Sequence, residues 1–112
     1  MPIPNSMLGL WQGEVIDANR VKPYAGVLCL DAEAGETLYQ MSHYLSTGVT
    51  KGKLTEPVEK DGWIVLHEYL HAGAAGLKED TLSLKLIDRD HLECAWSGAN
   101  AIMTRVETAD TK

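Results

Sequence analysis

The sequence predicts an all-β chain in which eight short strands close into a single up-and-down antiparallel barrel. Turn signals built from Gly, Pro, Asn and Asp recur about every ten residues, a spacing typical of many short antiparallel strands. Between the turns, apolar and polar residues alternate, as they do along half-buried strands. Closing the sheet removes its exposed edges, and eight strands leave room for side chains or one small ligand, so a barrel is favoured over a stacked sandwich.

The turn signals bound each expected strand in order. The first strand ends before Val21-Lys22-Pro23, and the second, apolar on both faces, is expected to be buried on both sides. Leu82, Leu84 and Leu86 share one face of the sixth, and Leu92, Cys94 and Trp96 share one face of the seventh. The eight expected strands are Met7–Asp17, Tyr24–Ala32, Glu36–Leu45, Gly48–Val58, Trp63–Ala72, Thr81–Ile87, His91–Ser97 and Ala101–Glu107.

All 112 residues are expected to form one domain, with the barrel spanning about residues 7–107. The formal charge is −6 and no run of Lys or Arg offsets it, so we expect no nucleic-acid or membrane partner. The N-terminus does not resemble a secretory signal and no 18-residue apolar stretch occurs, which indicates a soluble, cytoplasmic protein. Cys29 and Cys94 are expected to be buried thiols rather than a disulfide.

Gly9-Leu10-Trp11, in the first expected strand, resembles the Gly-x-Trp opening of the calycins, the group of small barrels that contains lipocalins, fatty-acid-binding proteins and avidins. In those proteins the Trp lies across the closed end of the barrel and an Arg from the last strand packs over it. Thr104-Arg105-Val106 here is similar to the closing segment of fatty-acid-binding proteins. The resemblance implies that Trp11 and Arg105 close the barrel through a cation–π contact. It does not extend to the carboxylate-binding Tyr of that segment, because Glu107 stands in its place.

A second motif, His67-Glu68-Tyr69-Leu70-His71, fits the His-Glu-x-x-His pattern of zinc peptidases. On a helix the two histidines would lie about 6 Å apart and reach one zinc, with Glu68 as general base. On a strand they are roughly 13 Å apart, at about 3.3 Å per residue, too far for one metal ion. A zinc peptidase is therefore an alternative only if residues 62–72 are helical.

The candidate ligand contacts are polar and aromatic side chains that would point into the barrel. They are Tyr39, Met41 and His43 on one expected strand and His67, Tyr69 and His71 on another. His91 follows a predicted hairpin turn and is expected to be exposed.

The sequence thus predicts a barrel that binds a small, mostly apolar or aromatic molecule in its interior. The first alternative is an isomerase, cyclase or hydrolase that uses a cavity histidine for acid–base chemistry. No catalytic residue is assigned, whether the protein is an enzyme stays open, and no cofactor or bound metal is expected. The sequence is compatible with a homodimer.

Overall fold

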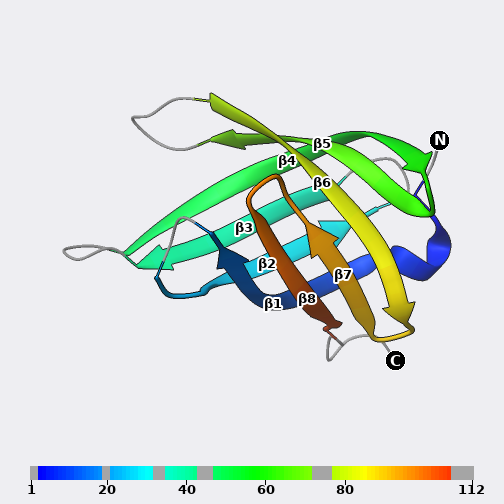
Figure 1. The fold of residues 1–112 in the computed structure, drawn as a ribbon, viewed down its shortest axis with the longest axis horizontal. Coiled ribbons are helices and arrows are strands. Elements are labelled where there is room, and N and C mark those ends of the chain that lie inside the picture. Colours follow the sequence, from blue (N-terminus) through cyan, green and yellow to red (C-terminus); the bar gives the residue numbers. More distant parts are fainter. Residues whose placement is uncertain (1–2, 19–20, 32–34, 43–46, 72–76, 107–112) are drawn as a thin grey trace.

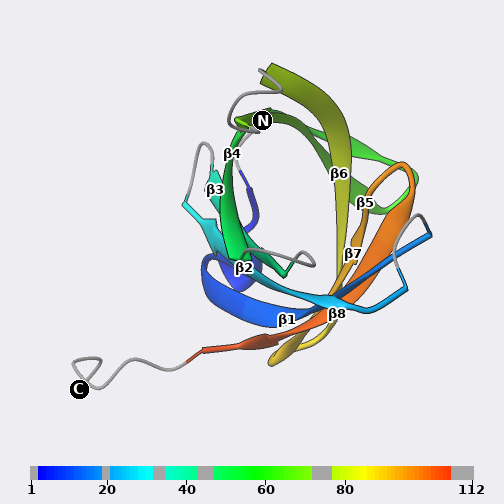
Figure 2. The same ribbon diagram turned by 90° about the vertical axis from the view of Figure 1, so that its left-hand side faces the viewer.

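The computed structural model describes residues 3–18, 21–31, 35–42, 47–71 and 77–106, without the side chains of residues 40–42, 47–50, 71, 77 and 78. The described residues form one closed barrel in which each strand pairs with its neighbours in sequence and β8 pairs with β1 (Figures 1 and 2). All pairs are antiparallel, which confirms the predicted fold class. The strands are β1 (Gly9–Asp17), β2 (Tyr24–Leu30), β3 (Gly35–Ser42), β4 (Thr47–Lys60), β5 (Trp63–His71), β6 (Leu77–Asp88), β7 (His91–Ala95) and β8 (Ala99–Arg105).

Two strands run longer than the sequence predicts. β4 extends to Lys60, beyond the expected end at Val58, and a register shift between Thr55 and Val58 takes Glu56 and Pro57 out of the ladder, with Glu56 at a φ of 58°. A bulge of this kind tolerates a proline that a regular ladder position would not. β6 begins at Leu77, before the expected Thr81. The turn after β4 has positive φ at both Asp61 and Gly62, as a type I′ hairpin requires.

The interior is filled by alternate residues of all eight strands, since side chains along a strand point to opposite faces. Within β5, for example, Ile64, Leu66 and Glu68 are buried, whereas the residues between them are partly exposed. The apolar core formed by the strands consists of Trp11, Val15, Leu28, Leu30, Tyr39, Leu54, Ile64, Leu66, Leu82, Leu84, Leu92, Cys94, Ala101 and Met103.

One end of the barrel, the closed end, is plugged by the N-terminal segment. The 3-10 helix η1 (Asn5–Met7) and Ile3 bring buried side chains against the core, and Trp11 Nε1 donates a hydrogen bond to the Met7 carbonyl at 2.9 Å. The Arg105 guanidinium lies 4.3 Å from the centre of the Trp11 ring. Its nitrogens donate to the carbonyls of Leu8 and Ser6, each at 2.7 Å, and of Arg89 at 3.0 Å. We call these contacts of Arg105 the clasp. The clasp holds the end of β8 to the segment that precedes β1.

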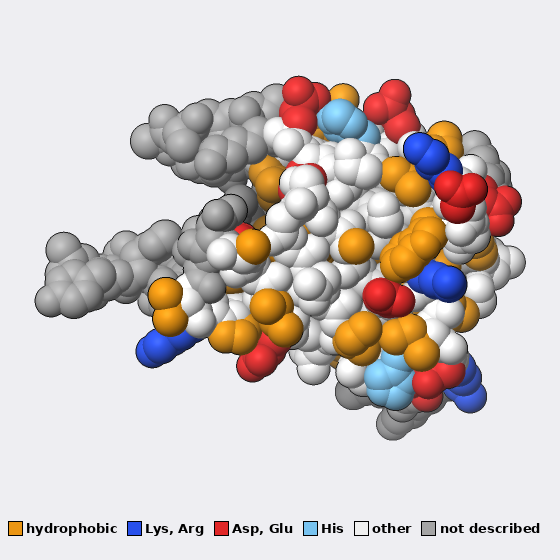
Figure 3. All heavy atoms as spheres, viewed as in Figure 1, with side chains coloured by type: hydrophobic (Ala, Val, Ile, Leu, Met, Phe, Trp, Pro, Cys, Tyr) orange, Lys and Arg blue, Asp and Glu red, His pale blue; other side chains and the backbone are white. Residues whose placement is uncertain are grey.

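The outer surface is mixed in character. On the face over which β6, β7 and β8 run, acidic and basic side chains are interspersed with apolar ones, and histidines lie at the surface (Figure 3). Cys29 and Cys94 are free thiols, as expected, but Cys29 is exposed because its position in β2 faces outward. The described residues contain no helix long and apolar enough to cross a membrane.

Candidate functional site

The end of the barrel opposite the clasp carries a buried polar network centred on Glu68. This carboxylate is fully buried, and it accepts hydrogen bonds from Thr37 Oγ1 at 2.6 Å, Tyr39 Oη at 2.5 Å and Trp96 Nε1 at 3.0 Å. The donors come from β3 and from the residue that follows β7, so the network ties opposite sides of the barrel together. A buried carboxylate is tolerated only when its oxygens are paired in this way.

Three effects act on the ionisation of Glu68. Burial raises the pKa of its carboxyl, because the charged form loses its hydration, while the three hydrogen bonds act in the opposite direction and the charge of Asp80 raises the pKa further. The net pKa lies above the ordinary value. Burial and the neighbouring Glu68 also raise the pKa of Tyr39 far above its usual range, so that its hydroxyl stays protonated as a donor.

Gly52 makes room for this network. It pairs with Thr37 on one side and Leu70 on the other, and its missing side chain would point into the interior. A Cβ atom at this position would lie 2.1 Å from Thr37 Oγ1 and 2.8 Å from Glu68 Oε2. Only glycine therefore allows the hydroxyl and the carboxylate to meet behind β4.

Around the network, the inward-facing residues at this end of the barrel are half-buried rather than buried. We call them the mouth: Asp17, Tyr24, Leu70, Asp80, Trp96 and Ala99. The Tyr39 ring packs edge to face against both Tyr24 and Trp96, with ring centres 6.0 and 5.9 Å apart. The mouth therefore combines aromatic surface with two carboxylates above the Glu68 network.

The structure describes the side chains of three of the six predicted ligand contacts, and they do not all face inward. Tyr39 is inside the barrel and belongs to the Glu68 network. His67 and Tyr69 lie on the outer face of β5, which corrects their expected orientation: the Ile64-Leu66-Glu68 face of the strand is the buried one. His67 Nε2 is 2.9 Å from Glu79 Oε1 at the surface. Whether any of these residues contacts a ligand stays a prediction.

The remaining predicted contacts lie outside the described part of the chain. His43 is not described, and neither are the side chains of Met41 and His71. His91 is exposed, with Nδ1 at 2.8 Å from Asp88 Oδ1 in the turn between β6 and β7. Among the described histidine side chains none points into the barrel, so a histidine acid–base mechanism has no support from them.

The zinc-peptidase alternative is wrong, because its condition is not met. The motif lies in strand β5, in which His71 follows His67 by four positions in extended conformation, and Glu68 points to the opposite face from His67. In the sequence, Glu68 is a candidate functional residue only through this motif. It shares a face with Ile64, Leu66 and Leu70, but because the opposite face of the strand is as apolar, this pattern alone does not mark Glu68 as an interior carboxyl.

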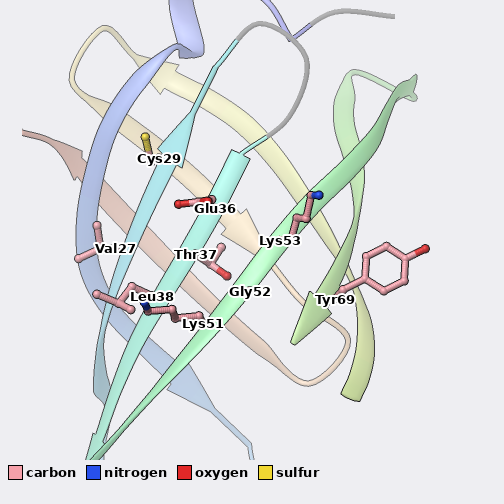
Figure 4. Close-up of a pocket in the computed structure, with 9 residues that line it drawn as sticks. All are labelled: Val27, Cys29, Glu36, Thr37, Leu38, Lys51, Gly52, Lys53 and Tyr69. Carbon is pink, nitrogen blue, oxygen red and sulfur yellow. The ribbon is translucent and has the colours of Figure 1, made fainter. Parts of the chain in front are cut away.

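A hollow lies outside the barrel, over β2, β3, β4 and β5 (Figure 4). This outer groove has a volume of about 680 Å³, and Tyr69 at its margin points away from the barrel. Its wall is mixed, with two lysines, one glutamate and the exposed Cys29 thiol. The groove is lined by Val27, Cys29, Glu36, Thr37, Leu38, Lys51, Gly52, Lys53 and Tyr69.

Comparisons with known proteins do not add to this description: no protein-family model, no curated protein and no solved structure matches the chain.

Proposed function

We propose that this protein is a calycin-like carrier or sensor that binds a small, mostly apolar or aromatic molecule at the mouth of its barrel. The observation that carries the proposal is the change in burial along the interior. Most inward-facing residues near the clasp are fully buried, such as Trp11 and Leu92, with Leu86 half-buried among them, whereas those of the mouth are all half-buried. Apolar and aromatic interior surface is therefore reachable from one end, which is how small barrels hold a ligand.

The Glu68 network gives this surface a fixed polar base. Its donors and acceptor are already satisfied by one another, so the polar groups are held in place before a ligand arrives. Binding to such a preorganised site loses little conformational freedom. Tyr24 and Trp96 offer the apolar contact area, because each aromatic ring buries a large surface.

The test uses the three tryptophans as separate reporters in an NMR titration of ¹⁵N-labelled protein with neutral aromatic fragments such as indole. Trp96 lies at the mouth, Trp11 at the closed end, and Trp63 on the outer face beside Lys85. Binding at the mouth is expected to shift the indole N–H signal of Trp96 and to leave that of Trp63 in place. A fragment that shifts Trp63 alone binds elsewhere and contradicts the proposal.

A pair of adjacent substitutions provides the control. Ala99→Phe fills the mouth, because Ala99 faces inward and packs against the core, and is expected to abolish the Trp96 response. Asn100→Phe adds the same ring on the exposed outer face of β8 and is expected to leave the response unchanged. Equal effects of the two substitutions would show that the mouth is not the binding site.

A further inference from the structure

We propose that two copies of this chain pair through the outer face of β5, β6, β7 and β8, related by a two-fold axis that runs along the strands between β6 and β7. The proposal does not depend on a ligand at the mouth. It is carried by the order of the outward-facing residues across these four neighbouring strands, which is complementary to itself in charge and in shape.

The outward-facing residues of these strands form two rows, which together we call the β5–β8 face. In the first row, Lys85 is the cross-strand partner of Glu93, and Glu93 is the partner of Ile102. The Lys85 amino group lies 5.5 Å from the centre of the Trp63 ring, which completes this row. The second row carries no charged side chain and consists of successive cross-strand partners: Val65, Ser83, Ala95 and Asn100. All eight side chains are exposed or half-buried on the outside of the barrel.

A two-fold axis along the strands brings opposite charges together. Such an axis keeps each row in place and reverses the order of the strands, so that β6 of one copy faces β7 of the other and β5 faces β8. Lys85 of each copy then faces Glu93 of the other, and Trp63 faces Ile102. The two charge contacts are equivalent, as an isologous interface requires. A partner of any other kind would not require this symmetry of the pattern.

The pattern continues by one strand on each side of the face. Lys60 on β4 is the cross-strand partner of Trp63, and both face outward. On β1, the exposed Glu14 lies between Gln12 and Ile16, which pair with β8, and so it stands beside Ile102. The same two-fold axis turns Lys60 of one copy toward Glu14 of the other. The charges therefore match at the margin of the interface as well as at its centre.

The first row has side chains available for contacts with a second copy. Among the described residues neither Lys85 nor Glu93 takes part in a salt bridge. Ile102 is 53% exposed, and a hollow of about 330 Å³ lies over β5, β6 and β7 beside Trp63. Ile102 of the second copy faces this hollow. An aromatic side chain that receives an apolar one, with charge pairs beside it, is typical of protein–protein interfaces.

The second row allows the two sheets to approach each other. Ser83 faces Ala95 of the other copy next to the axis, and Val65 faces Asn100. The small side chains at the centre leave room for two sheets to pack face to face. β6, β7 and β8 run over the side of the barrel shown in Figure 3, where apolar side chains lie exposed.

The first experiment measures the mass of the full chain by sedimentation equilibrium over a range of protein concentrations. The wild type is expected to form a dimer. Lys85→Glu and Glu93→Lys are each expected to weaken it at least about tenfold, because each places like charges opposite one another in both contacts. Lys51→Glu makes the same charge reversal on the exposed surface of β4, outside the β5–β8 face, and is expected to leave the dimer unchanged. A wild-type chain that stays monomeric overturns the proposal, and so does a dimer that neither variant of the face weakens.

The second experiment mixes Lys85→Glu with Glu93→Lys in equal amounts. In the mixed dimer both contacts again join opposite charges, since one copy contributes two acidic side chains and the other two lysines. The mixture is therefore expected to dimerise about as tightly as the wild type, although neither variant does so alone. Each variant keeps two like charges side by side within its own chain, so recovery on mixing cannot come from improved folding. If mixing gives no recovery, the two-fold arrangement is wrong.

Discussion

Replacing Gly52 with alanine is expected to destabilise the fold strongly, because the new methyl group enters the space of the Glu68 network. Its Cβ would lie 2.1 Å from Thr37 Oγ1, 2.8 Å from Glu68 Oε2 and 3.1 Å from Leu70 Cδ2. Inserting a methyl group into a packed interior costs about 1–3 kcal/mol. The displaced Thr37 hydroxyl also loses its bond to a charged acceptor, worth about 1.5–3 kcal/mol. The free energy of unfolding is therefore expected to fall by about 4 kcal/mol.

The assay is urea unfolding, followed by tryptophan fluorescence, with Gly98→Ala as the matched control. A Cβ at Gly98 meets nothing within 4 Å and its φ is not positive, so this substitution is expected to change the unfolding free energy by less than about 0.5 kcal/mol. If Gly52→Ala were as stable as Gly98→Ala, the steric account of the network would be refuted.

A double-mutant cycle locates the clash. Thr37→Ala removes Oγ1, the atom closest to the added Cβ, and alone is expected to cost about 1–3 kcal/mol by leaving Glu68 with one donor fewer. In combination with Gly52→Ala the cost should be less than the sum of the two by about 2 kcal/mol, since the clash disappears with the hydroxyl. Additive costs would mean that Thr37 is not the residue that Gly52 accommodates.

Three further perturbations test other parts of the structure. Arg105→Lys keeps the positive charge but removes the guanidinium group that donates to the carbonyls of Leu8 and Ser6. The free energy of unfolding in urea should therefore fall by about 2–3 kcal/mol, and an unchanged value would show that these hydrogen bonds do not stabilise the fold. The pKa of Glu68 is raised in the folded state, so the folded protein binds the carboxyl proton more tightly than the unfolded chain does. The stability that this proton provides is fully present below the ordinary carboxyl pKa of 4.5 and is lost as the pH rises through the raised pKa. Wild type should therefore lose stability relative to Glu68→Gln over that window, and parallel pH profiles would refute this. Iodoacetamide should label the exposed Cys29 in the native protein and Cys94 only after unfolding, because Cys94 is buried and its burial raises the pKa of the thiol to about 12. Mass spectrometry measures the labelling of each cysteine, and equal labelling rates in the native protein would contradict the burial of Cys94.

Local patterns were sufficient to predict the barrel but not which face of each strand points inward. The alternation of Leu82 and Leu84, and of Leu92, Cys94 and Trp96, is unambiguous, and those residues are buried or half-buried inside. β5 is ambiguous, because Trp63, Val65 and Tyr69 on one face are as apolar as Ile64, Leu66 and Leu70 on the other.

Glu68 resolves that ambiguity through contacts that its own strand does not contain. Its hydrogen-bond donors Thr37 and Tyr39 are about thirty residues earlier in the chain, and Trp96 is 28 residues later. The carboxylate is stable inside only because these groups converge on it. A pattern within residues 63–71 cannot show such a convergence, and for this reason His67 and Tyr69 are expected inside the barrel although they lie on its outer face.

The closure of the barrel has a consequence for folding kinetics. Every strand pair other than β1–β8 joins neighbours in sequence and can form as a hairpin, whereas β1–β8 joins Trp11 to Arg105 across almost the whole chain. Pairings with such large sequence separation carry the greatest loop-closure entropy and are expected to form last. Substitutions in the Arg105 clasp should then accelerate unfolding and leave the refolding rate nearly unchanged, so the clasp governs how long the native barrel persists rather than how fast it is made.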